Sequence, residues 1–313
     1  MTAKQTRIFA WLVISALALL PAAQAQQFGP WSVPINLGPT INTTLYYEQG
    51  AAISKDGLSL YFQSNRPGGY GNYDLYVSQR ASVNDAWGSP QNLGPNINTA
   101  GNDVGVTLSP DGHRLYFHSN RPGGFGGSDI YVSRRHNKRD DFGWQPAENL
   151  GPGVNTSAQE QQACIFEDEA TGITYLYFNS NRAGGLGGHD IYVSELQADE
   201  TFGPAVLVPE LSSTADDNGV AIRRDGLEIF FTSLRLPSTG PYGLEDLWVA
   251  IRQSTLDPWS EPVNLGPVVN SIYSDGAPEL SFDGTTLYFN SADPTHTSFD
   301  LFVSTRNKLK DQE

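Results

Sequence analysis

Apolar residues fall along the chain in short runs that are separated by Gly, Pro, Asn and Asp. The runs at 104–108, 114–119 and 129–133 are rich in aromatic and β-branched residues, and no helical period lies between them. Asp111 and Gly112 join the first two runs, which is the signal of a tight hairpin. The pattern predicts an all-β protein built from short antiparallel strands.

Three phrases recur together along the chain and define a repeating unit. A glycine-rich phrase, such as SNRPGGFGGSD at 119–129, separates an aromatic run from a run that begins with aspartate. A phrase with proline, usually also with tryptophan and Asn-Leu-Gly, ends the unit. The copies follow at intervals of 54 to 61 residues, counted between Asp74, Asp129, Asp190, Asp246 and Asp300. The chain therefore contains five copies of one unit.

Each unit encodes four strands, which is the content of one propeller blade. Proline marks the fourth strand as an edge strand, because proline cannot donate to a central ladder. The chain offers a fourth strand at 31–37 before any complete unit, and its last unit stops after a third strand at 300–304. We expect these two segments to pair and to close a ring of five blades, so that no sheet edge is left open.

The sequence thus predicts a five-bladed β-propeller with four antiparallel strands per blade, in which the N-terminal strand closes the last blade. The single propeller domain spans residues 26–313. The blades are expected at about 46–93, 102–150, 159–208, 216–265, and 274–304 together with 31–37.

The glycine-rich phrase could also suggest a phosphate-binding loop. A dinucleotide fingerprint needs its glycines to open a helix, so that the helix N-terminus faces the pyrophosphate. Here strand-like runs lie on both sides of the phrase. The phrase is therefore interpreted as the turn between the second and third strands.

The N-terminal residues have the pattern of a secretory signal peptide. Lys4 and Arg7 precede an apolar run at 8–20, which is followed by the motif AQAQ. We expect residues 1–25 to be cleaved after Ala25. Because the apolar run is too short for a stable membrane anchor, the expected product is a periplasmic or secreted protein without a membrane span.

Composition narrows the range of partners. The chain has 34 acidic and 19 basic residues and a formal net charge of −15, which disfavours nucleic acid and anionic lipid. Cys164 is the only cysteine and lies in an apolar run, so an intrachain disulfide is excluded and a buried thiol is expected. Packing alone must stabilise the fold, and we expect a monomer.

The segment SPDGHRLYFHSNRPGGFGGSDIYVS at 109–133 resembles the WD40-like, or TolB-type, β-propeller repeat of bacterial envelope proteins. The resemblance covers residues 31–306. It implies a periplasmic or secreted propeller that binds a protein or cell-wall partner.

Every unit carries an acid eight residues before the aspartate at or near its hairpin turn. This position begins the first strand, which lies nearest the axis of a propeller, so five carboxylates are expected to ring one mouth of the central channel. One interpretation is that each acid caps backbone N–H groups of the neighbouring blade, with no cofactor required. The other is a binding site for Ca²⁺ or a cationic side chain of a partner. This acid ring consists of Glu48, Asp103, Glu160, Asp217 and Asp275.

An arginine ends the second strand in four units, and an aspartate opens the third strand. A hairpin brings these two positions together, so we expect ion pairs that fix the glycine-rich turn. The expected pairs are Arg66 with Asp74, Arg121 with Asp129, Arg182 with Asp190, and Arg235 with Asp246.

The fifth unit differs, because Asp293 replaces the arginine and His296 lies between it and Asp300. Two carboxylates and an imidazole on one loop could ligate a metal. Exposed loops often carry such residues without a ligand, and we favour that interpretation.

The sequence favours a non-enzymatic binding or scaffold propeller that contacts an envelope protein or cell-wall glycan through its loop face. A glycosidase needs two carboxylates in unlike surroundings, whereas the ring acids occupy equivalent positions in near-identical repeats. The alternatives are a carbohydrate-active enzyme, a glycosidase or lyase with carboxylates at the channel mouth, and lectin-like glycan binding through Tyr70 and Tyr73. The sequence contains no serine elbow, zinc motif or P-loop, and no catalytic residue is assigned.

Overall fold

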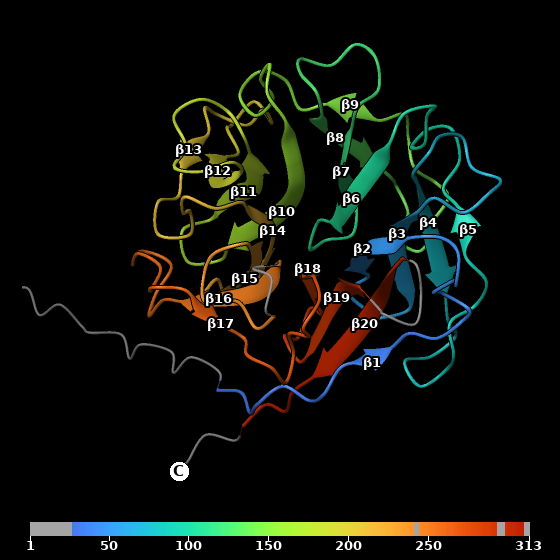
Figure 1. The fold of residues 1–313 in the computed structure, drawn as a ribbon. Coiled ribbons are helices and arrows are strands. Elements are labelled where there is room, and N and C mark those ends of the chain that lie inside the picture. The colour runs from blue at the N-terminus through green and yellow to red at the C-terminus, as the bar shows by residue number, and fades with distance from the viewer. Residues whose placement is uncertain (1–26, 241–243, 293–297, 310–313) are drawn as a thin grey trace, which may run out of the picture.

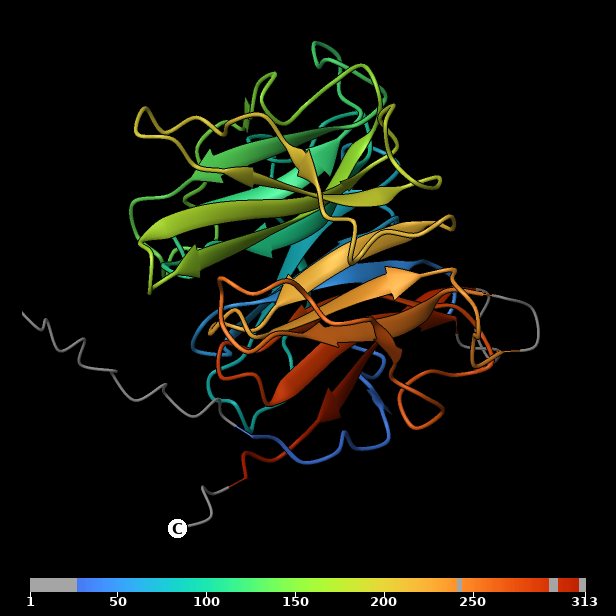
Figure 2. The ribbon, with the colours of Figure 1, turned by 90° about the vertical axis from the view of Figure 1, so that its left-hand side faces the viewer.

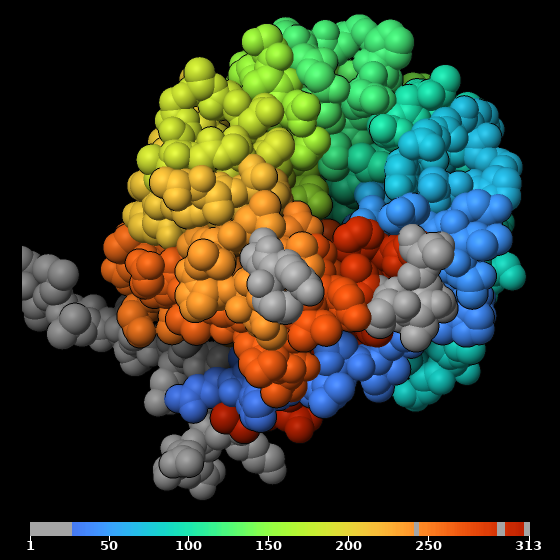
Figure 3. All heavy atoms as spheres, in the orientation of Figure 1, coloured from blue at the N-terminus to red at the C-terminus, as the bar shows by residue number. Residues whose placement is uncertain are grey.

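The protein is a five-bladed β-propeller. A computed structural model describes residues 27–240, 244–292 and 298–309. Five four-stranded antiparallel sheets stand around a central axis in chain order (Figures 1 and 3), and no helix occurs within these residues. The predicted fold class, blade number and strand content are confirmed.

Within each blade the strands follow from the axis outward in chain order, except in the last blade, where β1 is outermost. The first blade has β2 (Glu48–Ile53), β3 (Ser59–Ser64), β4 (Asp74–Gln79) and β5 (Gln91–Asn92). The second has β6 (Asp103–Leu108), β7 (Arg114–Ser119), β8 (Asp129–Arg134) and β9 (Glu148–Asn149). The third has β10 (Glu160–Asp168), β11 (Ile173–Ser180), β12 (Asp190–Glu195) and β13 (Val206–Leu207). The fourth has β14 (Asp217–Ile222), β15 (Glu228–Ser233), β16 (Asp246–Ile251) and β17 (Val263–Asn264). The fifth has β18 (Asp275–Leu280), β19 (Thr286–Ala292), β20 (Phe299–Thr305) and β1 (Ile35–Asn36).

The ring closes as the sequence predicts. Strand β1 pairs antiparallel with β20, with Ile35 opposite Val303. The described ends of the chain lie side by side at one edge of the disc (Figure 2), where Gly29 N donates to Asn307 O at 2.9 Å. Backbone hydrogen bonds therefore join the two ends of the chain.

Side chains from both chain ends reinforce this closure. The buried Arg306 guanidinium lies 3.9 Å from the ring centroid of Phe28 and 4.3 Å from that of Trp31. It also forms a two-point ion pair with Glu228 of the fourth blade, at 2.9 and 2.5 Å. The closure thus extends beyond the last sheet to its neighbour.

The hydrophobic core consists of five clusters, one between each pair of adjacent blades. Phe117 and Tyr61 belong to the cluster between the first two blades, and Phe178 and Tyr116 to the next. Facing sheets that bury aromatic and branched side chains in this way hold the ring together without disulfides.

The fourth strands are shorter than expected, with two residues each. Proline before the paired residues removes a donor, which explains the early end of the ladder. The asparagine of the recurrent Asn-Leu-Gly fixes the turn that follows the fourth strand. In the first blade, Asn92 Oδ1 accepts hydrogen bonds from Gly94 N and Asn98 Nδ2.

Each inner strand contains a bulge two residues after its first position. The bulged residue has a positive φ, which glycine adopts readily and other residues do not. Three blades have glycine there, but Gln162 has φ 48° and Ala277 has φ 50°. These two residues hold strained backbone at the narrowest part of the channel.

The predicted signal peptide, residues 1–25, lies outside the described residues. In the part of the chain that the structure describes, there is no helix with the length and apolar character needed to cross a membrane.

Candidate functional site

The acid ring lies at the start of the inner strands, as expected, but its carboxylates are fully buried. In the second blade, Asp103 accepts hydrogen bonds from Thr99 N at 2.6 Å and from the Ser119 hydroxyl at 2.6 Å. Equivalent backbone donors to the other ring acids are the N–H groups of Thr43, Thr156, Ser213 and Ser271. The capped residues lie in the connection that leads from the preceding blade, as in the capping interpretation.

Each arginine that ends a second strand pairs with its ring acid and not with the aspartate expected from the sequence. Among the described residues, the ion pairs of these arginines are Arg66 with Glu48 at 3.1 Å, Arg121 with Asp103 at 2.6 Å, Arg182 with Glu160 at 3.1 Å, and Arg235 with Asp217 at 2.6 Å. The expected pairing is thus corrected.

The reason lies in the glycine-rich turn. Asp74 accepts from Tyr70 N at 2.5 Å and from Gly71 N at 3.2 Å, so the turn's own backbone satisfies its carboxylate. The same contacts recur at Asp129 and Asp190, and Asp246 accepts from Thr239 N at 2.5 Å. The arginine, left without this partner, turns toward the inner strand.

The fifth blade has no arginine at this position. Burial raises the pKa of Asp275 to about 6, against smaller opposing effects of hydrogen bonds from Ser291 and Ser271. This carboxyl group therefore titrates close to neutral pH, unlike an exposed aspartate.

The candidate metal loop falls mostly outside the described residues, which include neither Asp293 nor His296. Asp300 lies buried in β20 and accepts a hydrogen bond from Asn36 Nδ2 at 2.7 Å. Asp74 accepts the equivalent hydrogen bond from Asn92 in the first blade. Within the described ranges, no three His, Cys, Asp or Glu side chains gather in a way that could hold a metal. Calcium in the channel stays a prediction, which a melting curve with and without EDTA would test.

The central channel opens at both ends and narrows at the bulges. One opening, here called the loop mouth, is a cavity of about 370 Å³ at the starts of the inner strands and the ends of the second strands, with His189 and Glu245 from the turns that lead to third strands. The other, the turn mouth, is a cavity of about 380 Å³ among the hairpin turns of the inner strands. A small void of about 30 Å³, lined by the bulged residues, lies between them.

Amide, imidazole and carboxylate side chains line the loop mouth. Most come from two positions that are equivalent in every blade, the residue after the ring acid and its partner on the second strand, and the residue type at these positions differs from blade to blade. The lining includes Gln49, Gln63, His118, Gln161, Gln162, His189, Asp216, Asn218, Glu245 and Asn290.

Backbone pairing between blades places two of these carboxylates. Asp217 N donates to His189 O at 2.8 Å, and Asp275 N donates to Glu245 O at 2.9 Å. The residue before each third strand is therefore held beside the inner strand of the next blade. Asp216 precedes the first residue of β14, and its Oδ1 accepts from His189 N at 2.7 Å.

The two carboxyl groups have unlike surroundings. Burial raises the pKa of the half-buried Glu245, and the nearby charge of Asp216 raises it further. The Asp216 side chain is 38% exposed, and its Oδ1 lies 3.5 Å from His189 Nδ1. A carboxyl group of raised pKa beside a more exposed carboxyl group is the arrangement that acid–base catalysis needs.

Two histidines complete the polar lining. Burial lowers the pKa of His118 to about 3, so its ring is neutral, and its Nδ1 accepts from Gln162 N at 3.2 Å. His189 Nε2 has no hydrogen-bond partner among the described residues. The loop mouth thus holds an unsatisfied polar atom beside its two carboxyl groups.

Sequence reasoning missed both carboxylates. Asp216 and Glu245 each stand directly before a recurrent aspartate, in the pairs Asp216-Asp217 and Glu245-Asp246. The signal was available, because the residue before the ring acid differs in all five units: Tyr47, Asn102, Gln159, Asp216 and Ser274.

Comparison with known proteins supports the fold and bears on the function. No family model and no curated protein matches the chain. Solved structures do match, among them an alpha-L-arabinofuranosidase from Lactobacillus brevis, with 16% identity over 88% of this chain and 95% of that one and a TM-score of 0.58. The GH62 alpha-L-arabinofuranosidase catalytic domain of Coprinopsis cinerea has 14% identity, coverage of 89% and 97%, and a TM-score of 0.59. An endo-arabinase from Bacteroides thetaiotaomicron has 16% identity, coverage of 91% and 100%, and a TM-score of 0.55.

At these identities the likeness shows the fold, and the WD40-like repeat family itself stays a prediction. The expectation of a non-enzymatic binding propeller was wrong, because the matching structures are glycoside hydrolases and favour the enzyme alternative. The physical reason is that the equivalent, buried ring acids are not the only carboxyl groups at this end of the channel. Asp216 and Glu245 each lie one residue before a recurrent aspartate, at positions where the other blades have no acidic residue.

Proposed function

We propose that the protein is a glycoside hydrolase whose active site is the loop mouth, with Glu245 as general acid and Asp216 as general base. The observation that carries this proposal is the pairing of a carboxyl of raised pKa with an exposed carboxylate in one polar cavity. Hydrolysis of a glycoside needs such a pair.

The reaction divides between the two groups. Glu245 gives its proton to the glycosidic oxygen, so that the leaving group departs as an alcohol while positive charge develops on the anomeric carbon. Asp216 takes a proton from the water that attacks this carbon. Transfer of that proton to Glu245 through solvent restores the starting state.

The lining supports a neutral sugar as substrate. Amide side chains such as Gln63, Gln162 and Asn218 offer both donors and acceptors to hydroxyl groups. The cavity of about 370 Å³ is near the lower end of ligand-site sizes, which suits the few sugar units next to the cleaved bond. Arabinose-containing glycans are the first substrates to assay, because the similar structures named above act on arabinosides or arabinan by name.

The signal peptide predicted at residues 1–25 supports a place of action outside the cytoplasm. A periplasmic or secreted hydrolase would meet glycans that do not enter the cell. The expected cell-wall glycan partner then becomes the substrate.

The test measures release of reducing sugar from arabinan, arabinoxylan and a chromogenic arabinofuranoside. Glu245→Gln and Asp216→Asn should each lower kcat/KM by roughly 100-fold or more, as expected for loss of a proton-transfer group. The exposed carboxylates Glu261 and Asp85 supply matched controls, Glu261→Gln and Asp85→Asn, which should leave the rate unchanged.

A chromogenic glycoside with a good leaving group separates the two roles. Its hydrolysis should suffer less from Glu245→Gln than that of arabinan, because such a leaving group needs no proton. Equal losses on both substrates would contradict the assignment of the acid. Sugar binding without turnover by the wild-type protein would refute the enzyme and match the lectin-like alternative.

A further inference from the structure

The turn mouth lies at the other end of the channel and takes no part in the proposed hydrolysis. We propose that it is a binding site for a small monocarboxylate with an apolar body, held at the rim by Lys55 and Arg224. This site shares no lining residue with the loop mouth and is therefore independent of the proposed function.

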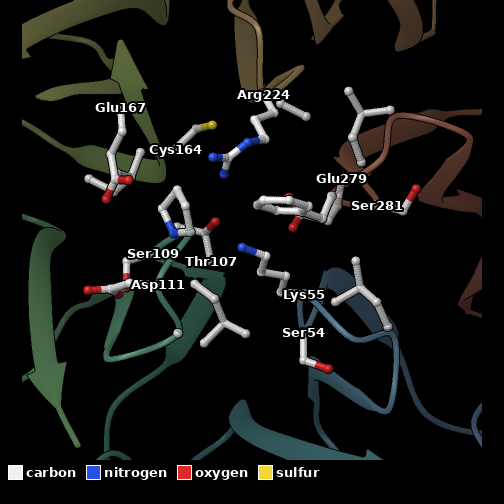
Figure 4. A pocket seen from close by; sticks show the side chains of 18 of the residues that line it. Ser54, Lys55, Thr107, Ser109, Asp111, Cys164, Glu167, Arg224, Glu279 and Ser281 are labelled. Atoms are coloured by element: carbon white, nitrogen blue, oxygen red, sulfur yellow. The ribbon is translucent and has the colours of Figure 1, made fainter. Parts of the chain in front are cut away.

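Two cations meet at this rim around one aromatic ring. Lys55 Nζ lies 4.0 Å from the ring centroid of Phe282, and the Arg224 guanidinium lies 4.2 Å from it. Figure 4 shows both side chains reaching into the same space from opposite sides of the cavity. Two converging cations in a chain with a net charge of −15 create a local positive potential that favours an anion.

Lys55 in particular has its charge available. In the described part of the chain, no carboxylate lies within 4.0 Å of its ammonium group, whereas Arg224 pairs with Glu169. That pair is exposed, with 41% of the arginine side chain and 72% of the glutamate side chain accessible. A ligand carboxylate can therefore join Lys55 without breaking a buried pair.

The wall below the rim is apolar. The sixth residue of each inner strand is branched and lines the cavity, and the fifth residue, here called the axis-facing position, is small in four blades. The branched residues are Ile53, Leu108, Ile165, Ile222 and Leu280. A ligand body of aromatic or aliphatic carbon fits such a lining better than a sugar does.

The fifth blade places Glu279 at the axis-facing position. Burial raises the pKa of Glu279 to about 8, so the group is largely neutral at pH 7 and does not repel a bound anion. Asp111 and Glu167 line the side away from Lys55, and Asp56 lines the cavity next to Lys55 in the chain. These three acidic residues disfavour a second negative charge on the ligand. The site is therefore expected to select monoanions.

Benzoate is the probe, with benzamide as a neutral control of the same shape and phthalate as a dianion. Ligand-observed NMR or calorimetry should give a Kd for benzoate on the order of 1 mM, a reasonable affinity for so few atoms. Benzamide and phthalate should bind at least fivefold more weakly. Raising the salt concentration should weaken the binding of benzoate, since the rim is exposed.

The variants Lys55→Met and Arg224→Met should each weaken benzoate binding by roughly tenfold, the usual effect of losing one charge-assisted contact. Both residues are exposed, so these variants should melt like the wild type. Lys308→Met removes an exposed lysine outside the cavity and should leave binding unchanged. Glu245→Gln should also bind benzoate normally, which separates this site from the proposed active site.

Three results would overturn the proposal. They are equal affinity for benzamide and benzoate, unchanged affinity in Lys55→Met, and no binding at about ten times the expected Kd.

Discussion

The ring acids offer a test of how buried charges act, because one exchange of carboxylate for amide should have opposite effects in two blades. Asp217 is fully buried and pairs with Arg235 at 2.6 Å. Asp275 occupies the equivalent position, but the sequence has Asp293 where the other blades have arginine. The perturbations are Asp217→Asn and Asp275→Asn.

The expected change in unfolding free energy depends on the hydrogen-bond and ion-pair partners of each carboxyl group. Asp217→Asn leaves Arg235 without its carboxylate, and breaking a buried pair costs about 3–5 kcal/mol of unfolding free energy. Asp275 has a folded-state pKa of about 6 against an ordinary value of 3.8, so ionisation opposes folding there. This difference between the two pKa values lowers the unfolding free energy by roughly 3 kcal/mol at pH 7. Asn at position 275 cannot ionise and can still accept from Ser271 N, so it should recover much of that free energy.

The sign of the pH dependence is distinctive. A carboxyl with a raised folded-state pKa favours the folded protein while it is protonated, so the wild type loses stability as the pH rises from about 4 to about 6. The gain from Asp275→Asn should therefore be near zero at pH 4 and reach its full size by pH 7. Asp217→Asn should destabilise at both pH values.

Urea unfolding followed by tryptophan fluorescence, at pH 4, 5, 6 and 7, measures both effects. A change of the midpoint at constant m-value reports stability alone. The reasoning fails if both variants shift the midpoint in the same direction at pH 7, or if the effect of Asp275→Asn does not change with pH.

Three further predictions concern the closure, the bulge and the proposed acid. Arg306→Met should lower the unfolding free energy by about 2 kcal/mol, because the buried Glu228 loses two charge-assisted hydrogen bonds and keeps Arg223 as its only arginine partner among the described residues; an unchanged urea midpoint would contradict the closure described above. Gln162→Gly should change stability by less than about 1 kcal/mol, since relief of left-handed strain offsets the added freedom of the unfolded chain. The same variant should lower kcat/KM severalfold, and equal activity would exclude Gln162 from the site. A ¹³C NMR titration should show a lower midpoint for Glu245 in Asp216→Asn than in the wild type, because the charge of Asp216 helps to raise that pKa.

The fold could be predicted from the sequence because each blade repeats the same turn and capping residues. The hairpin at Asp111 and Gly112, the turn capped by Asp129 and the exit fixed by Asn149 all depend on contacts within one unit or with its neighbour. Such contacts leave a pattern with a fixed interval. The pairing of β1 with β20 could be predicted from the two ends of the chain. The N-terminal end has a fourth strand without the three that precede it, and the last unit has three strands without a fourth.

The ion pairs could not be predicted in the same way. A hairpin brings Arg121 near Asp129, but other donors compete for the Asp129 carboxylate. The backbone N–H groups of Phe125 and Gly126 satisfy Asp129 first, and Asp103 takes the arginine. A choice among several nearby partners depends on side-chain geometry, which the repeat pattern does not contain.

Repetition also explains why the site was missed. A residue that recurs in all five units does the same work in each, and here that work is structural, as the burial and capping of Asp103 show. Acid–base catalysis on a pseudo-symmetric ring requires that residues at equivalent positions of different blades differ in type or surroundings. That condition is met at Asp216 and Glu245 in the loop mouth and at Glu279 in the turn mouth, where the other blades have no acidic residue. In a propeller of near-identical repeats, the positions that depart from the repeat are therefore the ones to test for function.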